Sequence, residues 1–154
     1  MNVRPAHPIL IVEDSDEDYF STVRALRKSG LANLIYRCED GDDAIAYLFR
    51  KGRYSDAETS PAPGIILLDL NLPGTDGQGV LAEIKQDAVL KKIPVIMLTT
   101  SDDERDIDRC YAEGANSYIL KPVDMKGFID AIQQLRDYWF EIVILPKVEV
   151  RSEK

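Results

Sequence analysis

The residues best suited to chemistry stand directly after short apolar segments. They are Glu13, Asp14, Asp69, Thr99 and Lys121. A carboxylate beside an apolar segment costs free energy unless it is paired, solvated or bound to a metal ion. Asp69 follows the apolar run 65–68, so its carboxylate needs such a role. It is either a functional residue or a structural cap, since Asp is also common before a Pro-Gly turn.

These side chains suit the transfer of a phosphoryl group. Clustered carboxylates without histidine favour a hard, oxygen-preferring cation such as Mg²⁺. Phosphoryl transfer needs such an ion, a positive side chain and a nucleophile held in line. Asp69 could be the nucleophile, because carboxylates form acyl phosphates. Lys121 would offset charge on the phosphoryl group, and the Thr99 hydroxyl could bind one of its oxygens.

The other acids near Asp14 have a simpler explanation. Acidic side chains in the first turn of a helix are favoured by its dipole, which accounts for Asp16, Glu17 and Asp18 at the start of a helix predicted over 16–29. Ser15 or Asp16 could cap that helix. Capping does not account equally well for Glu13 and Asp14, which precede the helix.

Apolar segments alternate with helical patterns along the chain. We predict strands over 8–12, 34–38, 65–69, 94–98 and 118–120, and helices over 16–29, 41–50, 79–86, 102–113 and 125–136. This alternation predicts an α/β fold with a doubly wound parallel sheet between two layers of helices. A parallel sheet gathers the carboxyl ends of its strands at one edge, where ligands bind at the switch point. The reactive residues should therefore meet at that edge.

Composition excludes several classes of function. The 154 residues fit one domain, and the formal net charge of -8 opposes binding to nucleic acid. No apolar run approaches the about 20 residues of a membrane span, and the N-terminus lacks a signal-peptide core, so we expect a cytoplasmic protein with no membrane partner. His7 is the sole histidine, which leaves Ser/His/Asp catalysis without a suitable base. Cys38 and Cys110 show no metal-binding spacing and should be buried.

From about Pro8 to Arg136 the chain resembles a response-regulator receiver domain of two-component signalling. The motifs that carry this resemblance are Glu13-Asp14, the run Leu67-Leu68-Asp69-Leu70-Asn71-Leu72-Pro73 with Asp76-Gly77, Leu98-Thr99-Thr100, Gly114-Ala115 and Lys121-Pro122. The resemblance implies a flavodoxin-like sheet of strand order 2-1-3-4-5. It also implies that Asp69 accepts a phosphoryl group from a sensor histidine kinase.

The resemblance assigns roles to further residues. Glu13, Asp14, Asp69 and the backbone carbonyl of Asn71 would arrange the Mg²⁺ site, directly or through water. Thr99 and Tyr118 would form the conformational switch, and Lys121-Pro122 would be a cis peptide bond. Many relatives carry Asp where this chain has Glu13, so its contact with the ion could run through water. Asn71 and Ser101 occupy positions that tune phosphate lifetime in the family.

We expect a receiver domain over 1–137 and an apolar extension over 138–154, with no output module after the receiver. Residues 138–154 form an apolar extension that is too rich in aromatic and aliphatic side chains for a disordered end. It either folds over its own domain or forms a homodimer through Trp139, Phe140, Ile142 and Leu145. The extension and the polar loop 51–63 resemble those of stand-alone regulators of phytochrome-type kinases. The loop is either an added contact surface or a tolerated insertion.

We therefore expect a signalling protein and not an enzyme. The alternative is a Mg²⁺-dependent phosphohydrolase with an aspartyl-phosphate intermediate, but such enzymes usually place a second acid where this chain has Asn71. A third possibility is a phosphorylation-independent binding module with a relic pocket. The intact acids, Thr99 and Lys121 argue against it.

Overall fold

The computed structural model describes residues 7–28 and 30–134. Strands alternate with helices along this part of the chain, as the sequence predicts. The order is β1 (Ile9–Val12), α1 (Asp16–Lys28), β2 (Ile35–Cys38), α2 (Gly41–Leu48), the 3-10 turn η2 (Gly52–Tyr54), β3 (Ile65–Asp69), α3 (Gly77–Gln86), the 3-10 turn η3 (Leu90–Lys92), β4 (Val95–Thr99), α4 (Glu104–Glu113), β5 (Ser117–Leu120) and α5 (Met125–Gln134).

The five strands form one parallel sheet of order β2-β1-β3-β4-β5. This arrangement confirms the predicted flavodoxin-like fold. In register, Val12 of β1 lies beside Leu68 of β3, and Asp69 lies beside Leu98 of β4. The carboxyl ends of β1, β3 and β4 therefore stand next to one another.

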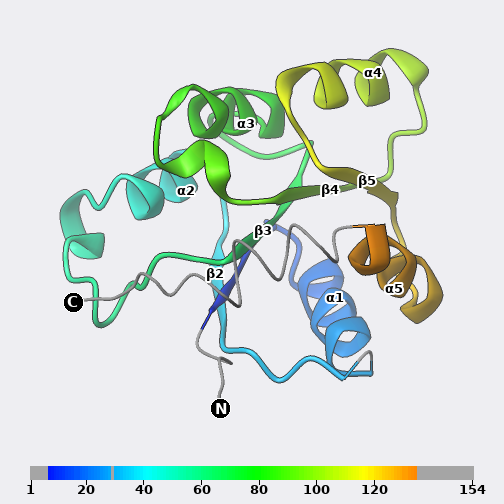
Figure 1. The fold of residues 1–154 in the computed structure, drawn as a ribbon, viewed down its shortest axis with the longest axis horizontal. Helices are drawn as coiled ribbons and strands as arrows, with labels where there is room; N and C mark the ends of the chain where they lie inside the picture. The colour runs from blue at the N-terminus through cyan, green and yellow to red at the C-terminus, as the bar shows by residue number, and fades with distance from the viewer. Residues whose placement is uncertain (1–6, 29, 135–154) are drawn as a thin grey trace.

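Helices cover both faces of the sheet (Figure 1), with α1 and α5 on one face and α2, α3 and α4 on the other. Strands β1, β3 and β4 are buried at every position, so successive side chains enter opposite layers. Leu10 and Val12 pack in the cluster of α2 and α3, whereas Ile9 and Ile11 pack in the cluster of α1 and α5. Burial on both faces fixes the strand ends, which carry the reactive residues.

The start of α3, which lies close to the site, differs from the prediction. Helix α3 begins at Gly77 and not at residue 79, because the Asp76 carboxylate accepts a hydrogen bond from the Gly79 N–H (2.9 Å) and caps the helix there. A Cβ at Gly77 would lie 2.2 Å from the Asp69 carbonyl oxygen. Only glycine therefore lets α3 start so close to the end of β3.

The 51–63 loop contains the turn η2 and folds back onto α2. The Tyr47 hydroxyl donates to the Pro61 carbonyl (2.7 Å), and the Arg50 guanidinium donates to the Ser60 carbonyl (3.0 Å).

Both cysteines are fully buried, as predicted. None of the helices in the described ranges is long and apolar enough to cross a membrane.

Candidate functional site

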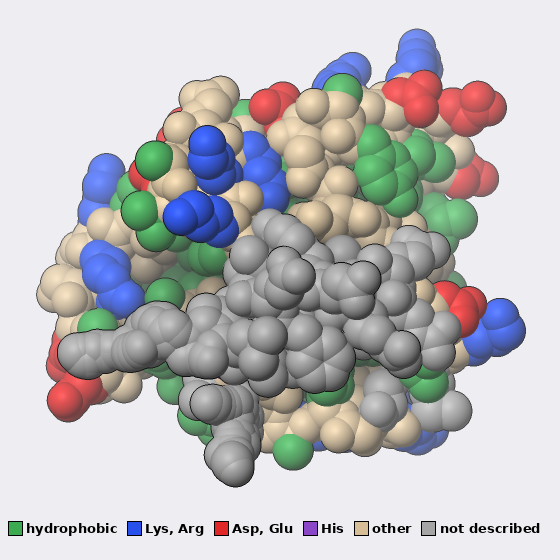
Figure 2. All heavy atoms as spheres, viewed as in Figure 1, with side chains coloured by type: hydrophobic (Ala, Val, Ile, Leu, Met, Phe, Trp, Pro, Cys, Tyr) green, Lys and Arg blue, Asp and Glu red, His purple; other side chains and the backbone are tan. Residues whose placement is uncertain are grey.

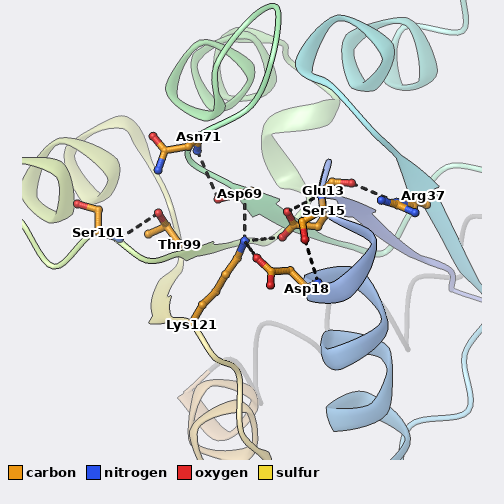
Figure 3. Close-up of polar contacts among 9 residues, drawn as sticks. All are labelled: Glu13, Ser15, Asp18, Arg37, Asp69, Asn71, Thr99, Ser101 and Lys121. Atoms are coloured by element: carbon orange, nitrogen blue, oxygen red, sulfur yellow. Dashed lines mark hydrogen bonds and ion pairs between the residues drawn. The ribbon is translucent and has the colours of Figure 1, made fainter.

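The residues that the sequence singles out lie together at the carboxyl edge of the sheet (Figure 3). Glu13 follows β1, Asp69 and Thr99 end β3 and β4, and Lys121 follows β5. The side chains of Glu13, Asp69, Thr99 and Lys121 are nearly or fully buried, and Asp14 is exposed. Polar groups thus converge where the apolar strands end.

The ammonium group of Lys121 lies at the centre of this cluster. Its Nζ is 2.6 Å from Glu13 Oε1, 3.0 Å from Asp18 Oδ2 and 3.1 Å from Asp69 Oδ2. The Lys121 side chain is 8 % exposed, Glu13 3 %, Asp69 7 % and Asp18 39 %. A buried ion pair is tolerated only when its charges are compensated, and here one buried cation is shared by three carboxylates.

Carboxylate oxygens of Glu13, Asp14 and Asp69 lie within 4.8 Å of one another. An all-oxygen set of this kind fits a hard divalent cation such as Mg²⁺ or Mn²⁺. The negative charge is in excess, since Lys121 supplies only one positive charge to Glu13 and Asp69, and Asp14 is not among its ion-pair partners. The site can therefore accept further positive charge.

The pKa values reflect this crowding. Burial, together with the charge of Asp69, raises the pKa of Glu13 to about 7, although the hydrogen bond from Lys121 acts in the opposite direction. Burial alone would lower the pKa of Lys121. The hydrogen bonds to Glu13 and Asp18 and the charge of Asp69 outweigh burial and raise that pKa, so the ammonium stays charged.

The loop from β1 to α1 is held by its own side chains. The Ser15 hydroxyl accepts a hydrogen bond from the Asp18 N–H (3.2 Å), so Ser15, one of the two predicted candidates, caps α1. The Ser15 N–H donates to Glu13 Oε2 (3.2 Å). Asp18 follows the helix-dipole preference, but its ion pair with Lys121 was not predicted, because nothing local in the sequence links residues so far apart.

Arg37 of β2 is a second residue that sequence reasoning missed. Its Nε donates to the Glu13 carbonyl (3.1 Å), its Nη1 pairs with Asp16 (2.8 Å), and its guanidinium lies 4.5 Å from the centre of the Tyr19 ring. Arg37 therefore fixes the backbone of Glu13 from the side away from Lys121 (Figure 3). Its place beside β1 depends on the sheet register, which the sequence did not show.

The remaining predicted residues contact Asp69 or the loop that follows β4. The Asn71 N–H donates to Asp69 Oδ1 (3.3 Å), and Thr99 Oγ1 accepts from the Ser101 N–H (3.2 Å). The Tyr118 hydroxyl donates to the carbonyl of Ser101 (2.9 Å), so the two predicted switch residues contact the same loop. The peptide bond Lys121–Pro122 is cis, as expected. The proposed dimer residues Trp139, Phe140, Ile142 and Leu145 lie outside the described residues.

Comparison with known proteins identifies the family. Residues 9–133 match the family model for the response regulator receiver domain. The chain belongs to the response regulator receiver family. The matched residues include the five strands of the sheet, α1 to α4, and α5 as far as residue 133. Members of this family are signalling proteins. The resemblance inferred from the motifs is confirmed.

The relatives of this receiver include stand-alone regulators. It is 42 % identical over 142 residues to response regulator Rcp1 of Synechocystis sp., which covers 92 % of this chain and 95 % of Rcp1. The solved structure of the Mn²⁺-bound form of Rcp1 has a TM-score of 0.71 at 39 % identity and covers 95 % of this chain and 99 % of that one. The phosphorylated cyanobacterial phytochrome response regulator RcpA has a TM-score of 0.74 at 38 % identity, with 92 % and 99 % covered.

The raised pKa of Glu13 predicts a pH dependence of stability in the absence of divalent cations. Between its ordinary pKa of 4.5 and the folded-state value of about 7, the folded protein keeps a proton that the unfolded chain has released. The stabilising contribution is complete below the lower value and is lost as pH rises through the higher one. In EDTA, the free energy of unfolding of the wild type relative to Glu13→Gln should fall by about 2 kcal/mol from pH 5 to 7.5.

Urea denaturation at both pH values measures this difference. A difference between the two proteins that does not change with pH would show that Glu13 titrates normally in the folded state.

Proposed function

We propose that this receiver accepts a phosphoryl group on Asp69 from a sensor histidine kinase, with Mg²⁺ held by Glu13, Asp14, Asp69 and the carbonyl of Asn71. The observation that carries the proposal is the meeting of three carboxylates within 4.8 Å beside the Lys121 ammonium. The Mn²⁺-bound form of Rcp1 and the phosphorylated form of RcpA support it by similarity.

The residues of this chain then have distinct tasks. An Asp69 oxygen attacks phosphorus, the phosphorus–nitrogen bond of the phosphohistidine breaks, and its electron pair returns to the imidazole of the kinase. The Asn71 N–H holds Oδ1 of Asp69 and Lys121 holds Oδ2, so the carboxylate is oriented before it reacts. The bound cation would neutralise charge that develops on the phosphoryl oxygens.

Thr99 and Tyr118 would carry the signal away from Asp69. Thr99 is fully buried at the end of β4, and its hydroxyl accepts from the same Ser101 whose carbonyl binds Tyr118. Rotation of the Thr99 hydroxyl towards a phosphoryl group would release the Ser101 N–H. The loop after β4 and the Tyr118 ring would then change together, which shifts a two-state equilibrium.

We further propose a phytochrome-type kinase as the donor, because RcpA is a phytochrome response regulator and is 38 % identical to this chain. Nucleic acid is not a proposed partner. The formal net charge is -8, which opposes binding to nucleic acid. On the face shown in Figure 2 several basic side chains lie on the left with apolar ones between them, and acidic ones lie towards the edges. The output is therefore proposed to be a contact with another protein.

A catalytic role is not proposed. A phosphohydrolase with an aspartyl-phosphate intermediate needs a general acid near the leaving group, and the residue two positions after Asp69 is Asn71, whose amide does not titrate. We propose that the chain is a phosphoacceptor and signalling protein.

Substitution of Asp69 tests the phosphoacceptor directly. Incubation with Mg²⁺ and radiolabelled acetyl phosphate should label the wild type through an acyl phosphate that base hydrolyses. Asp69→Asn should lose labelling, because an amide oxygen is a poor nucleophile, whereas Asp76→Asn should be labelled like the wild type, since Asn also caps helices. Labelling of Asp69→Asn to the wild-type extent would reject the assignment.

We also propose that residues 138–154, which follow the receiver domain assigned to 1–137, mediate homodimerisation. The support is compositional, because Trp139, Phe140, Ile142 and Leu145 stand close together in the sequence. Light scattering after size exclusion should give a dimer mass for the wild type and a larger monomer fraction for Trp139→Ala, because a large apolar contact is lost.

The control for this experiment is Phe20→Ala, which removes an exposed aromatic ring from α1 and should leave the mass unchanged. A monomeric wild type, with and without beryllofluoride, would remove the dimer proposal.

A further inference from the structure

Asp18 is an acid that the phosphoacceptor mechanism does not use, yet it contacts the central amine of the site. Its Oδ2 lies 3.0 Å from Lys121 Nζ, as close as Asp69 does at 3.1 Å. Figure 3 shows the Asp18 side chain extending from the first turn of α1 towards Lys121. The contact joins residues 103 positions apart, so it is not a local feature of the helix.

The position of the Asp18 carboxylate is also not explained by helix capping. Asp18 stands three residues after the cap Ser15, where an acidic side chain commonly turns back to the N–H of the capping residue. In this chain that N–H already donates to Glu13 Oε2, and Ser15 Oγ accepts from the Asp18 N–H. The Asp18 carboxylate therefore has no role at the cap, and Lys121 is its only recorded ion-pair partner among the described residues.

Lys121 needs an ion-pair partner that does not also bind the cation. Its two other partners, Glu13 and Asp69, belong to the carboxylate set that fits a cation. An ammonium held by these two alone would compete with the cation for their oxygens. Asp18 is outside that set and is more exposed than either of them, with 39 % of its side chain accessible.

We propose that Asp18 is the counter-ion that holds the Lys121 ammonium on the α1 side of the acid cluster, so that Glu13 and Asp69 are available to a divalent cation. This inference rests on the proposed function, since it presumes that Glu13, Asp14 and Asp69 bind the cation. Asp18 is a positioning residue in this account, because it acts through Lys121 and does not touch the cation or the phosphoryl group.

The inference predicts a specific loss of cation affinity. In Asp18→Asn the ammonium loses one charged partner and binds Glu13 and Asp69 more tightly, so the dissociation constant for Mn²⁺ should rise roughly 3- to 10-fold, a size expected for one partly exposed charged contact. Glu17→Gln is the matched control. It removes the same charge from the same helical turn, but Glu17 is exposed and outside the Lys121 ion pairs, so its effect should stay below about twofold.

Isothermal titration calorimetry with Mn²⁺ alone measures these constants without any phosphoryl donor. The same two substitutions are then made in a Lys121→Met protein. If Asp18 acts through the amine, Asp18→Asn should change the dissociation constant for Mn²⁺ no more than Glu17→Gln does in this background. Circular dichroism melting curves identify any variant that is not folded.

Two results would overturn the inference: equal effects of Asp18→Asn and Glu17→Gln in the wild-type background, or an effect of Asp18→Asn that is as large without Lys121 as with it. The second result would mean that Asp18 attracts the cation directly. Asp14→Asn separates this test from the proposed function. If the wild type binds Mn²⁺ and Asp14→Asn does not, the cation site stands whatever Asp18 does, whereas a wild type without affinity would overturn both proposals.

Discussion

The site depends on one constraint: the ammonium of Lys121 must neutralise carboxylates that the fold brings together in a buried place. Glu13 and Asp69 stand at the ends of strands that are buried on both faces, and each would be costly there without a positive partner. Lys121 contacts both, with its side chain only 8 % exposed. Because one ammonium does not balance all of the nearby acids, the cluster keeps an affinity for added cations. The stability of the fold and the function of the site thus depend on the same charged side chains.

The architecture places these charges with little freedom. The parallel order β2-β1-β3-β4-β5 sets the ends of β1, β3 and β4 side by side, and Lys121 follows β5 at the same edge. Contacts outside the acid cluster then hold its members. Arg37 fixes the backbone of Glu13, Ser15 caps α1, and the missing side chain of Gly77 lets α3 start beside Asp69. The reactive side chains are held from both sides, which is what preorganisation of a charged site requires.

Much of this could be predicted from the sequence. Apolar runs with acids or an amine at their ends predict the strands, the shared edge and the principal residues, because strand alternation and the geometry of parallel sheets are local and general rules. Asp18 and Arg37 could not be assigned in this way, since their contacts depend on tertiary register. Asp18 also satisfied a simpler rule, the preference of acids for helix N-termini, which hid its ion pair with Lys121. The start of α3 was predicted two residues late because the Asp76 cap was overlooked.

In the proposed site, Lys121 and a divalent cation are neighbours that share carboxylates without excluding each other. Diffraction from crystals grown with Mn²⁺, using the anomalous signal of the metal, tests this arrangement most directly. We expect one anomalous peak among Glu13, Asp14 and Asp69, with Lys121 Nζ still within hydrogen-bond distance of Asp18. A peak elsewhere, or a metal that displaces Lys121 from Asp18, would contradict it.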